Sequence, residues 1–255
     1  MKSENGLWKM KVSIITVCYN SVETIKDTIE SVINQNYPNI EYIVIDGKSD
    51  DGTNEIIQKY KDEISCYLSE KDRGIYDAMN KGIQSATGDL IGILNSDDIY
   101  SNNGVITKIV DHIGNNDGIY ADLVYVDQHD LNKVKRVWKS GHYSDGAFKW
   151  GWMPPHPTFF IKRECYKIYG DYNLIMKSAA DYEFMLRVIH KHKISIAYFS
   201  EVIIKMRMGG ISNISLKNRI KANRDDKKAW IINQLTPNLF TFLLKPIRKL
   251  SQFRI

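Results

Sequence analysis

The first hundred residues alternate between short apolar runs and segments in which apolar residues recur every three or four positions. The runs Val12–Val17, Glu41–Ile45 and Leu90–Leu94 are rich in Val, Ile and Leu. Runs of this kind predict strands that are buried on both faces of a parallel sheet. Between them, Ile25–Ile33 and Ile75–Thr87 follow helical spacing. The alternation therefore predicts parallel strands joined by right-handed crossover helices.

This regular alternation ends after Asp98. Gly88 is expected to stop the preceding helix as its C′ residue. Further strands are predicted at Cys66–Leu68, Ile119–Val126, Lys133–Trp138, Pro157–Ile161 and Ile194–Lys205, and further helices at Asn103–Ile113, Arg163–Tyr169, Asp181–Lys191 and Lys217–Asn233. No internal repeat or clear linker divides these elements, so a single large α/β domain is expected.

Polar side chains follow three of the predicted strands at the points where the strands end. Tyr19 follows the first strand, Asp46 ends the second, and Asp97 and Asp98 follow the third. Ligands of open α/β sheets bind just beyond the carboxyl ends of the strands. There an aromatic ring can stack on a base, and a carboxylate can bind the base or ribose hydroxyls. Two adjacent acids repel each other, and a divalent cation would remove that penalty; the alternative is a solvated turn in which Asp98 caps the next helix.

Composition and missing motifs exclude several classes of protein. The glycine fingerprint of nicotinamide enzymes and the Walker motif of P-loop kinases are both absent. The content of 43% apolar and 25% charged residues is ordinary for a soluble protein, and no apolar run approaches the roughly 20 residues of a spanning helix. The three cysteines are far apart in the sequence, which favours reduced thiols in the cytosol.

The net charge of +5 is unevenly placed along the chain. From Lys217 onward there are ten Lys/Arg and two Asp, a net charge of +8, so the rest of the chain carries −3. A basic tail on an acidic body indicates an anionic surface as partner. Because no helix-turn-helix, zinc or aromatic RNA-binding pattern is present, a membrane surface is favoured over nucleic acid.

Five stretches carry a family resemblance when they are taken together and in order. They are Val12–Asn20, Tyr42–Gly52, Glu70–Asp98, Pro155–Phe159 and Ala180–Glu183. They resemble the GT-A-fold glycosyltransferases of family 2. The run Glu70–Gly82, EKDRGIYDAMNKG, is similar to a bacterial polysaccharide and O-antigen branch of that family.

The resemblance implies a fold and a division of the chain. The expected fold is GT-A: a mostly parallel, Rossmann-like sheet flanked by helices, with a smaller mixed sheet on the acceptor side. Residues 1–10 would be a leader and 11–213 the catalytic domain, with a nucleotide-sugar-binding half at 11–98 and an acceptor-side half at 99–213. Residues 214–255 would form basic amphipathic helices.

The resemblance also implies roles for individual residues. Asp97 would contact ribose, and Asp98 would bind Mn²⁺ or Mg²⁺. Asp181 matches the general base of the family, although without the resemblance it reads equally well as a helix N-cap. The remaining implied positions are Tyr19 and Asp46 at the nucleotide base, Arg73 at the diphosphate, and His156 and Trp152 on the acceptor side.

Three features of the sequence bear on these roles: two departures from the family pattern and one loop. Asn95 and Ala180 stand where many relatives carry an additional acid. His156 and Trp152 also have ordinary structural explanations, as a core histidine and a core aromatic residue. Arg207 with Gly209–Gly210 would form either a mobile loop that closes over phosphate or a plain turn.

The function that these expectations describe is metal-dependent, inverting glycosyl transfer. The donor would be a UDP-hexose, and the acceptor a polyprenyl-diphosphate-linked glycan in bacterial O-antigen, capsule or exopolysaccharide assembly, with β-1,3-glucosyl or galactosyl transfer as the specific expectation. The enzyme would be cytoplasmic and peripherally bound to the inner face of the membrane. The alternatives are a non-catalytic nucleotide-sugar-binding module and a sugar-phosphate nucleotidyltransferase, although the latter would need a Gly- and Arg-rich loop after the first strand.

Overall fold

The computed structural model describes residues 10–176, 178–209, 216–250 and 252, with backbone only for 216–223, 249 and 250. The predicted leader therefore lies outside the described residues except for Met10, and so does Gly210 of the predicted loop.

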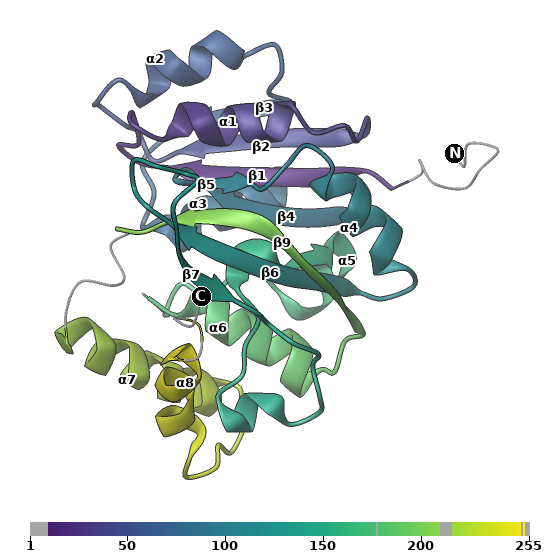
Figure 1. Ribbon diagram of the computed structural model, residues 1–255, viewed down its shortest axis with the longest axis vertical. Helices are drawn as coiled ribbons and strands as arrows, with labels where there is room; N and C mark the ends of the chain where they lie inside the picture. Colours follow the sequence, from purple (N-terminus) through teal and green to yellow (C-terminus); the bar gives the residue numbers. More distant parts are fainter. Residues whose placement is uncertain (1–9, 177, 210–215, 251, 253–255) are drawn as a thin grey trace.

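The first half of the chain forms parallel strands in the order β3-β2-β1-β4 (Figure 1). The strands are β1 (Val12–Cys18), β2 (Ile40–Asp46), β3 (Cys66–Ser69) and β4 (Leu90–Asn95), and the intervening helices are α1 (Ile25–Ile33), α2 (Thr53–Ile57), the 3₁₀ turn η1 (Gln58–Tyr60) and α3 (Ile75–Ser85). The predicted β-α alternation is confirmed in this half.

Two glycines let the chain pack closely around β1. Gly82 lies on α3 against the sheet, where a Cβ atom would come within 2.4 Å of Ile15. The prediction for Gly88 is wrong, because α3 already ends at Ser85. A Cβ atom on Gly88 would lie 2.5 Å from Ser13 Oγ, so close approach to β1 requires glycine there.

The second half extends the same sheet with mixed pairings. Its elements are β5 (Asp98–Tyr100), α4 (Val105–Ile113), β6 (Gly118–Val126), β7 (Val134–Trp138), η2 (Ala147–Trp150), η3 (His156–Thr158), β8 (Phe160–Lys162), α5 (Arg163–Tyr169), α6 (Ala180–Met185), η4, a π-helix (Leu186–Lys191), and β9 (Ile196–Arg207). The strand order continues β4-β8-β6-β9-β5, and β7 pairs with β6. The predicted α/β class is confirmed; β8 runs antiparallel to both β4 and β6 and joins the mixed part to the parallel part.

Two predicted segments have a different local structure. The strand predicted at Pro157–Ile161 is a 3₁₀ turn followed by the three-residue β8. The helix predicted at Asp181–Lys191 is α6 followed by a π-helical turn. In both places tertiary packing decides the local conformation, which periodicity alone cannot reveal.

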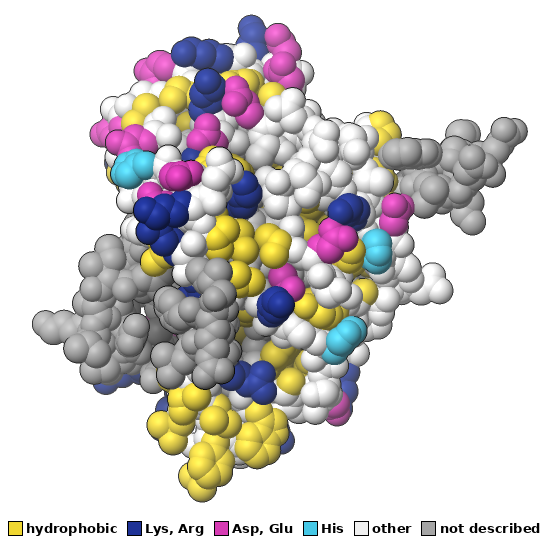
Figure 2. Space-filling view, viewed as in Figure 1, with side chains coloured by type: hydrophobic (Ala, Val, Ile, Leu, Met, Phe, Trp, Pro, Cys, Tyr) yellow, Lys and Arg dark blue, Asp and Glu magenta, His cyan; other side chains and the backbone are white. Residues whose placement is uncertain are grey.

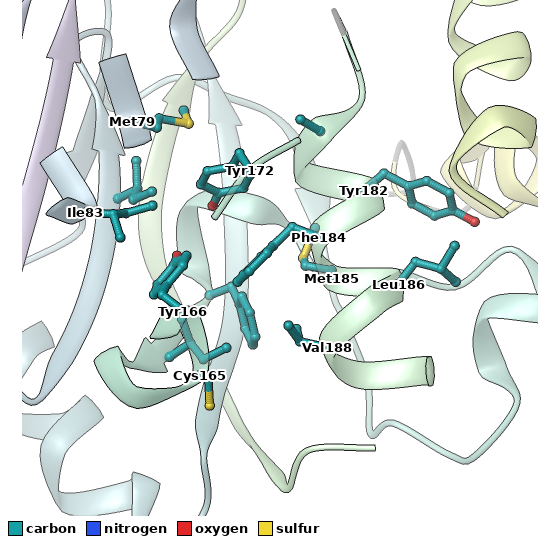
Figure 3. Close-up of a cluster of buried hydrophobic side chains, with 14 of the residues drawn as sticks. Met79, Ile83, Cys165, Tyr166, Tyr172, Tyr182, Phe184, Met185, Leu186 and Val188 are labelled. Carbon is teal, nitrogen blue, oxygen red and sulfur yellow. The ribbon is translucent and has the colours of Figure 1, made fainter. Parts of the chain in front are cut away.

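The sheet separates two hydrophobic cores. Along β1, Ile15 and Val17 pack in one core, and Val12 and Ile14 pack in the other, as alternation on a strand requires. Figure 3 shows part of the first core, where α6 packs with residues of α3 and α5.

A charged network closes the end of the sheet at which β1 begins. The buried Glu41 carboxylate accepts hydrogen bonds from Lys11 Nζ (2.6 Å), Ser13 Oγ (2.6 Å) and the Thr87 backbone N–H (2.7 Å). Burial alone would raise the pKa of Glu41, but these donors outweigh it and lower the pKa to about 2.

The last two helices, α7 (Leu216–Ile232) and α8 (Thr241–Leu250), dock against the body at α6 and η2 (Figure 1). The fully buried Trp230 donates its indole N–H to the Tyr182 hydroxyl of α6 at 2.8 Å. Among the described residues, no helix is both long enough and apolar enough to cross a bilayer.

Candidate active site

The carboxyl ends of β1, β2 and β4 meet at one edge of the sheet, as predicted. In the strand register Cys18 pairs with Asp46, and Val17 pairs with Asn95. The ring of Tyr19 is 64% exposed. It lies beside the end of β2, where a Cβ atom on Gly47 would be 3.3 Å from it. An exposed ring at this edge is available to stack on a planar ligand.

Asp46 is fully buried, and protein donors surround its carboxylate. It accepts hydrogen bonds from the Ser49 backbone N–H (3.1 Å) and from Ser69 Oγ (2.6 Å). Burial, reinforced by the Asp46 charge, raises the pKa of the neighbouring Cys18 thiol, so this cysteine remains protonated at neutral pH. In the structure Asp46 anchors the loop that carries Ser49, and its predicted contact with a nucleotide base stays a prediction.

Asp98 is a buried carboxyl group, and one of its oxygen atoms has no partner in the part of the chain that the structure describes. It begins β5, which pairs antiparallel with β9, and its side chain is fully buried. Asn95 Nδ2 donates to Oδ2 at 3.2 Å. Within the described part of the chain, neither Asp98 Oδ1 nor Asn95 Oδ1 has a hydrogen-bond partner. Burial, followed by the adjacent Asp97 charge, raises the pKa of Asp98 well above its usual range.

These two unpaired oxygen atoms suit a hard divalent cation. A cation would remove the cost of a charged carboxylate at Asp98, and Mg²⁺ and Mn²⁺ prefer oxygen ligands. In the described ranges, no group of three or more His, Cys, Asp or Glu side chains could hold a metal by itself. The residues present therefore fit a cation whose remaining ligands come from a substrate phosphate and water.

Arg207 binds the backbone of this loop from the end of β9. Its guanidinium donates to the Asp97 carbonyl (3.0 Å) and the Gln128 carbonyl (3.2 Å), and it pairs with Asp27 at 2.5 Å. The side chain is buried. Arg207 is the last residue of the long strand β9 and fixes the backbone position of Asp97. The predicted loop, mobile or a plain turn, continues to Gly210 outside the described residues and stays a prediction.

A second polar cluster lies between α3 and α6. The Tyr76 hydroxyl donates to Asp181 Oδ1 at 2.9 Å, so the carboxylate is held in the first turn of α6. His156 Nε2 and the Tyr172 hydroxyl are 2.7 Å apart, and the rings of Tyr76 and Tyr172 have centroids 5.7 Å apart. Figure 3 shows Tyr172 between α3 and Phe184 of α6.

Burial shapes the protonation of this cluster. Burial lowers the pKa of His156, and the Asp181 charge opposes that shift only in part, so the imidazole is neutral at pH 7. Burial and then Asp181 raise the pKa of Tyr76, so its hydroxyl keeps the proton that it donates. Asp181 is therefore a half-buried carboxylate that the described residues hold through the Tyr76 hydroxyl, which is an arrangement suited to accepting a proton from a hydroxyl group.

In the structure, Arg73 and Trp152 make contacts that differ from the predicted ones. The exposed Arg73 guanidinium lies just before α3 and pairs at 2.8 Å with Asp77 in the first turn of that helix, and this partner raises the pKa of Arg73. Trp152 is only 5% exposed, and its indole N–H donates to the Ser140 carbonyl at 2.8 Å. Its ring packs in the core, and its predicted acceptor contact stays a prediction.

Sequence reasoning assigned no role to Tyr76 or Tyr172. Tyr76 lies within the run Glu70–Gly82 that carries the family resemblance, next to the residue at which α3 begins. Its place in that run was the signal that could have identified it. Tyr172 lies in an irregular segment between α5 and α6, where the pattern of the sequence carries no information about its partner.

Comparisons with known proteins match most of this chain. The family model described as glycosyl transferase family 2 matches residues 13–184. An uncharacterised glycosyltransferase of Mycobacterium tuberculosis is 34% identical over 178 residues, which are 69% of this chain and 68% of that protein. TuaG of Bacillus subtilis, a glycosyltransferase named for teichuronic acid biosynthesis, is 39% identical over 94 residues, or 36% of this chain and 37% of TuaG.

Solved structures share the architecture at low sequence identity. TarS of S. aureus in complex with UDP-GlcNAc has a TM-score of 0.71 at 18% identity, covering 95% of this chain and 73% of that one. The mannosyltransferase PcManGT from Pyrobaculum calidifontis, in complex with GDP-Man and Mn²⁺, has a TM-score of 0.66 at 17% identity, covering 94% and 68%. These likenesses extend over both halves of the sheet.

Proposed function

The chain belongs to glycosyl transferase family 2, has the predicted GT-A fold and is a glycosyltransferase, and from that premise we propose that it transfers a hexose from a UDP-sugar to a polyprenyl-diphosphate-linked glycan, with inversion. The observation that carries the proposal is the buried Asp98 carboxyl group at the edge where β1, β2 and β4 end, one oxygen of which has no partner among the described residues. A buried carboxylate is destabilised when no cation is bound, and nucleotides bind at this edge of open α/β sheets. Such a site suits a sugar diphosphate held with a cation.

The donor half is proposed to hold the nucleotide through residues of this edge. Tyr19 stacks on the base, Asp46 accepts a hydrogen bond from the base, and Asp97 bonds the ribose. Arg73 would leave Asp77 to approach the diphosphate, since the Arg73 side chain is exposed in front of α3. A cation held by Asp98, when bound, would stabilise the charge of the departing diphosphate.

Asp181 is proposed as the general base. Its carboxylate takes the proton from the acceptor hydroxyl as that oxygen attacks the anomeric carbon and the bond to the diphosphate breaks. Tyr76 keeps the carboxylate in place through the 2.9 Å hydrogen bond. One base and no covalent intermediate give inversion at the anomeric carbon. His156, neutral beside this cluster, and Trp152 are proposed to line the acceptor side.

Fewer observations support the specific donor and acceptor than support the reaction class. Two structures of TarS contain UDP or UDP-GlcNAc, which favours a uridine nucleotide, whereas PcManGT holds GDP-Man. TuaG is named for a cell-surface polysaccharide. We therefore propose β-1,3-glucosyl or galactosyl transfer in O-antigen, capsule or exopolysaccharide assembly, by a cytoplasmic enzyme at the inner face of the membrane.

A panel of nucleotide sugars tests the donor proposal. Each is added with Mn²⁺, and the melting temperature is measured, because a ligand that binds only the folded state raises it. UDP-hexoses should stabilise the protein more than GDP- or CMP-sugars, and only with the metal present. Nucleotide release with a lipid-linked acceptor then measures transfer, and NMR of the product measures the anomeric configuration.

Three outcomes would contradict the proposal. Stabilisation by donors without release of nucleotide would indicate a binding module. Formation of a nucleotide sugar from sugar phosphate and nucleoside triphosphate would indicate a nucleotidyltransferase. Full turnover in excess EDTA would rule out the cation at Asp98.

A further inference from the structure

Large apolar side chains gather on the outer face of α8 and the loop before it. Figure 2 shows hydrophobic side chains concentrated at this end of the molecule. We call Leu239, Phe240, Leu243 and Ile247 the C-terminal apolar patch; their side chains are 89%, 53%, 62% and 56% exposed. The spacing of three and four residues from Phe240 to Ile247 places them on one face of the helix.

The opposite face of α8 is fixed to the body. Thr241 Oγ1 donates to the Lys149 carbonyl at 2.7 Å. Lys245 Nζ pairs with the buried Asp226 at 2.7 Å and lies 3.6 Å from the centre of the Tyr182 ring. A docked helix that, together with the loop before it, keeps four large apolar side chains in solvent indicates a surface for a further apolar phase.

A tryptophan lies on the element next to this helix. Trp150 ends η2, which packs against α8, and its side chain is 52% exposed. Gly151, at φ +74°, brings this segment so close to Lys245 that a Cβ atom would lie 2.4 Å from its backbone nitrogen. Exposed tryptophan beside aliphatic residues is typical of proteins that sit at a membrane–water interface.

The charge around the patch is positive. Between Arg224 and Arg248 there are five Lys/Arg and two Asp. Both acids face the body, since Asp226 is buried against Lys245 and Asp225 is hydrogen-bonded to Ser178. Two exposed lysines, Lys149 and Lys227, remain at the surface. This charge opposes association of the face with a second copy of itself and favours an anionic partner.

We propose that the C-terminal apolar patch, with Trp150, inserts into the headgroup region of a bilayer that contains anionic lipids. A ten-residue helix is about 15 Å long, which is half the hydrocarbon thickness, so it lies in the interface rather than spanning it. Through Lys245 and Tyr182 the same helix contacts α6, which carries Asp181. Only one consequence of this proposal rests on the proposed function: insertion of the patch would bring the acceptor side close to a lipid-linked substrate.

Vesicle sedimentation tests the surface without any substrate. Full-length protein should sediment with vesicles of phosphatidylglycerol and phosphatidylcholine at low salt, and less with phosphatidylcholine alone or at high salt. The double variant Phe240→Ser/Leu243→Ser should bind the vesicles at least about tenfold more weakly, because two large apolar groups no longer enter the interface. Lys227→Glu should weaken binding only to the anionic vesicles.

Ile168→Ser on α5 is the matched control, because Ile168 is 62% exposed, the same fraction as Leu243. It should leave vesicle binding unchanged. Release of nucleotide from a soluble donor should be the same in all these proteins, so loss of lipid binding is distinguished from failure of the proposed reaction.

Three results would overturn the proposal. The first is full-length protein that stays in the supernatant at low salt with anionic vesicles. The second is a loss of binding in Ile168→Ser as large as that in the double variant. The third is a wild-type mass by sedimentation equilibrium that falls by half in the double variant, since the patch would then be a subunit interface.

Discussion

At the scale of single residues, Asp98 combines complete burial with a carboxylate oxygen to which no described residue hydrogen-bonds. The pKa of this group is raised by burial and by Asp97, so at pH 7 its charge destabilises the metal-free protein. We predict that Asp98→Asn lowers transfer by about 10³-fold or more, while the melting temperature without metal stays the same or rises. Asp62→Asn, which removes an exposed carboxylate, should change neither quantity. Retained activity with a lower melting temperature would assign Asp98 a structural role.

The Tyr76–Asp181 hydrogen bond gives a second prediction at this scale. Asp181→Asn should lower kcat by about 10²–10⁴-fold with near-normal donor affinity, as expected for loss of a positioned base. Tyr76→Phe removes the only side-chain donor that the described residues provide to this carboxylate. Without this hydrogen bond the base is no longer held in position, so Tyr76→Phe should lower kcat by less than Asp181→Asn does and leave donor affinity near normal. Weaker donor binding in Asp181→Asn with unchanged kcat would instead place Asp181 in the donor half.

Residue identity predicted some of these positions and could not predict others. Asp98 and Tyr19 follow strands whose apolar runs are unmistakable, so their placement at one edge follows from topology. The burial of Trp152 and the pairing of Arg73 with Asp77 depend on packing angles and rotamers. Sequence spacing does not encode these, so an exposed tryptophan and a buried one look alike before the fold is known.

At the scale of elements, the network around Glu41 ties β1, β2 and the segment before β4 together. Because folding lowers the pKa of Glu41 from 4.5 to about 2, its stabilising effect is complete above pH 4.5 and is lost as pH falls toward 2. We predict that Glu41→Gln destabilises the protein by about 1.5–3 kcal/mol at pH 7. The difference from wild type should shrink in urea titrations below pH 4.5.

Glu201 provides the matched control for this prediction. Lys108 and Glu201 are 2.6 Å apart, the same distance as Lys11 and Glu41, but both side chains are more than 40% exposed. An exposed pair contributes about 0–1 kcal/mol, so Glu201→Gln should have little effect at any pH. Equal effects of the two variants would mean that burial does not strengthen the Glu41 network.

Two strands, one missed in the sequence and one predicted with other bounds, share one property. β5 and β8 have three residues each, and they exist because β9, β4 and β6 pair with them. A segment such as Asp98–Tyr100 has no periodicity of its own, whereas β1 and β2 are long, apolar and recognisable alone. Short strands of this kind follow from tertiary contacts, which lie outside any local window.

At the scale of the whole molecule, one continuous sheet links the two predicted halves, 11–98 and 99–213. Because β8 hydrogen-bonds to both β4 and β6, neither half has a complete set of strand partners alone. We predict a single cooperative unfolding transition. In native-state hydrogen exchange, the slowest amides of β2 and β6 should open with the same free energy. Separate values for the two strands would mean that the halves unfold as independent units.

The place of β8 in the sheet also sets an order of events for a chain that is still being synthesised. The parallel half is complete at Asn95, but the strand that covers the free edge of β4 begins at Phe160. At ribosomal speeds of about 5–20 residues per second, that edge stays uncovered for roughly 3–13 s. During this time the nascent chain presents unpaired backbone groups to which other strands can attach. We therefore expect that chaperone cover of the nascent chain during these seconds raises the fraction of the protein that reaches the folded state.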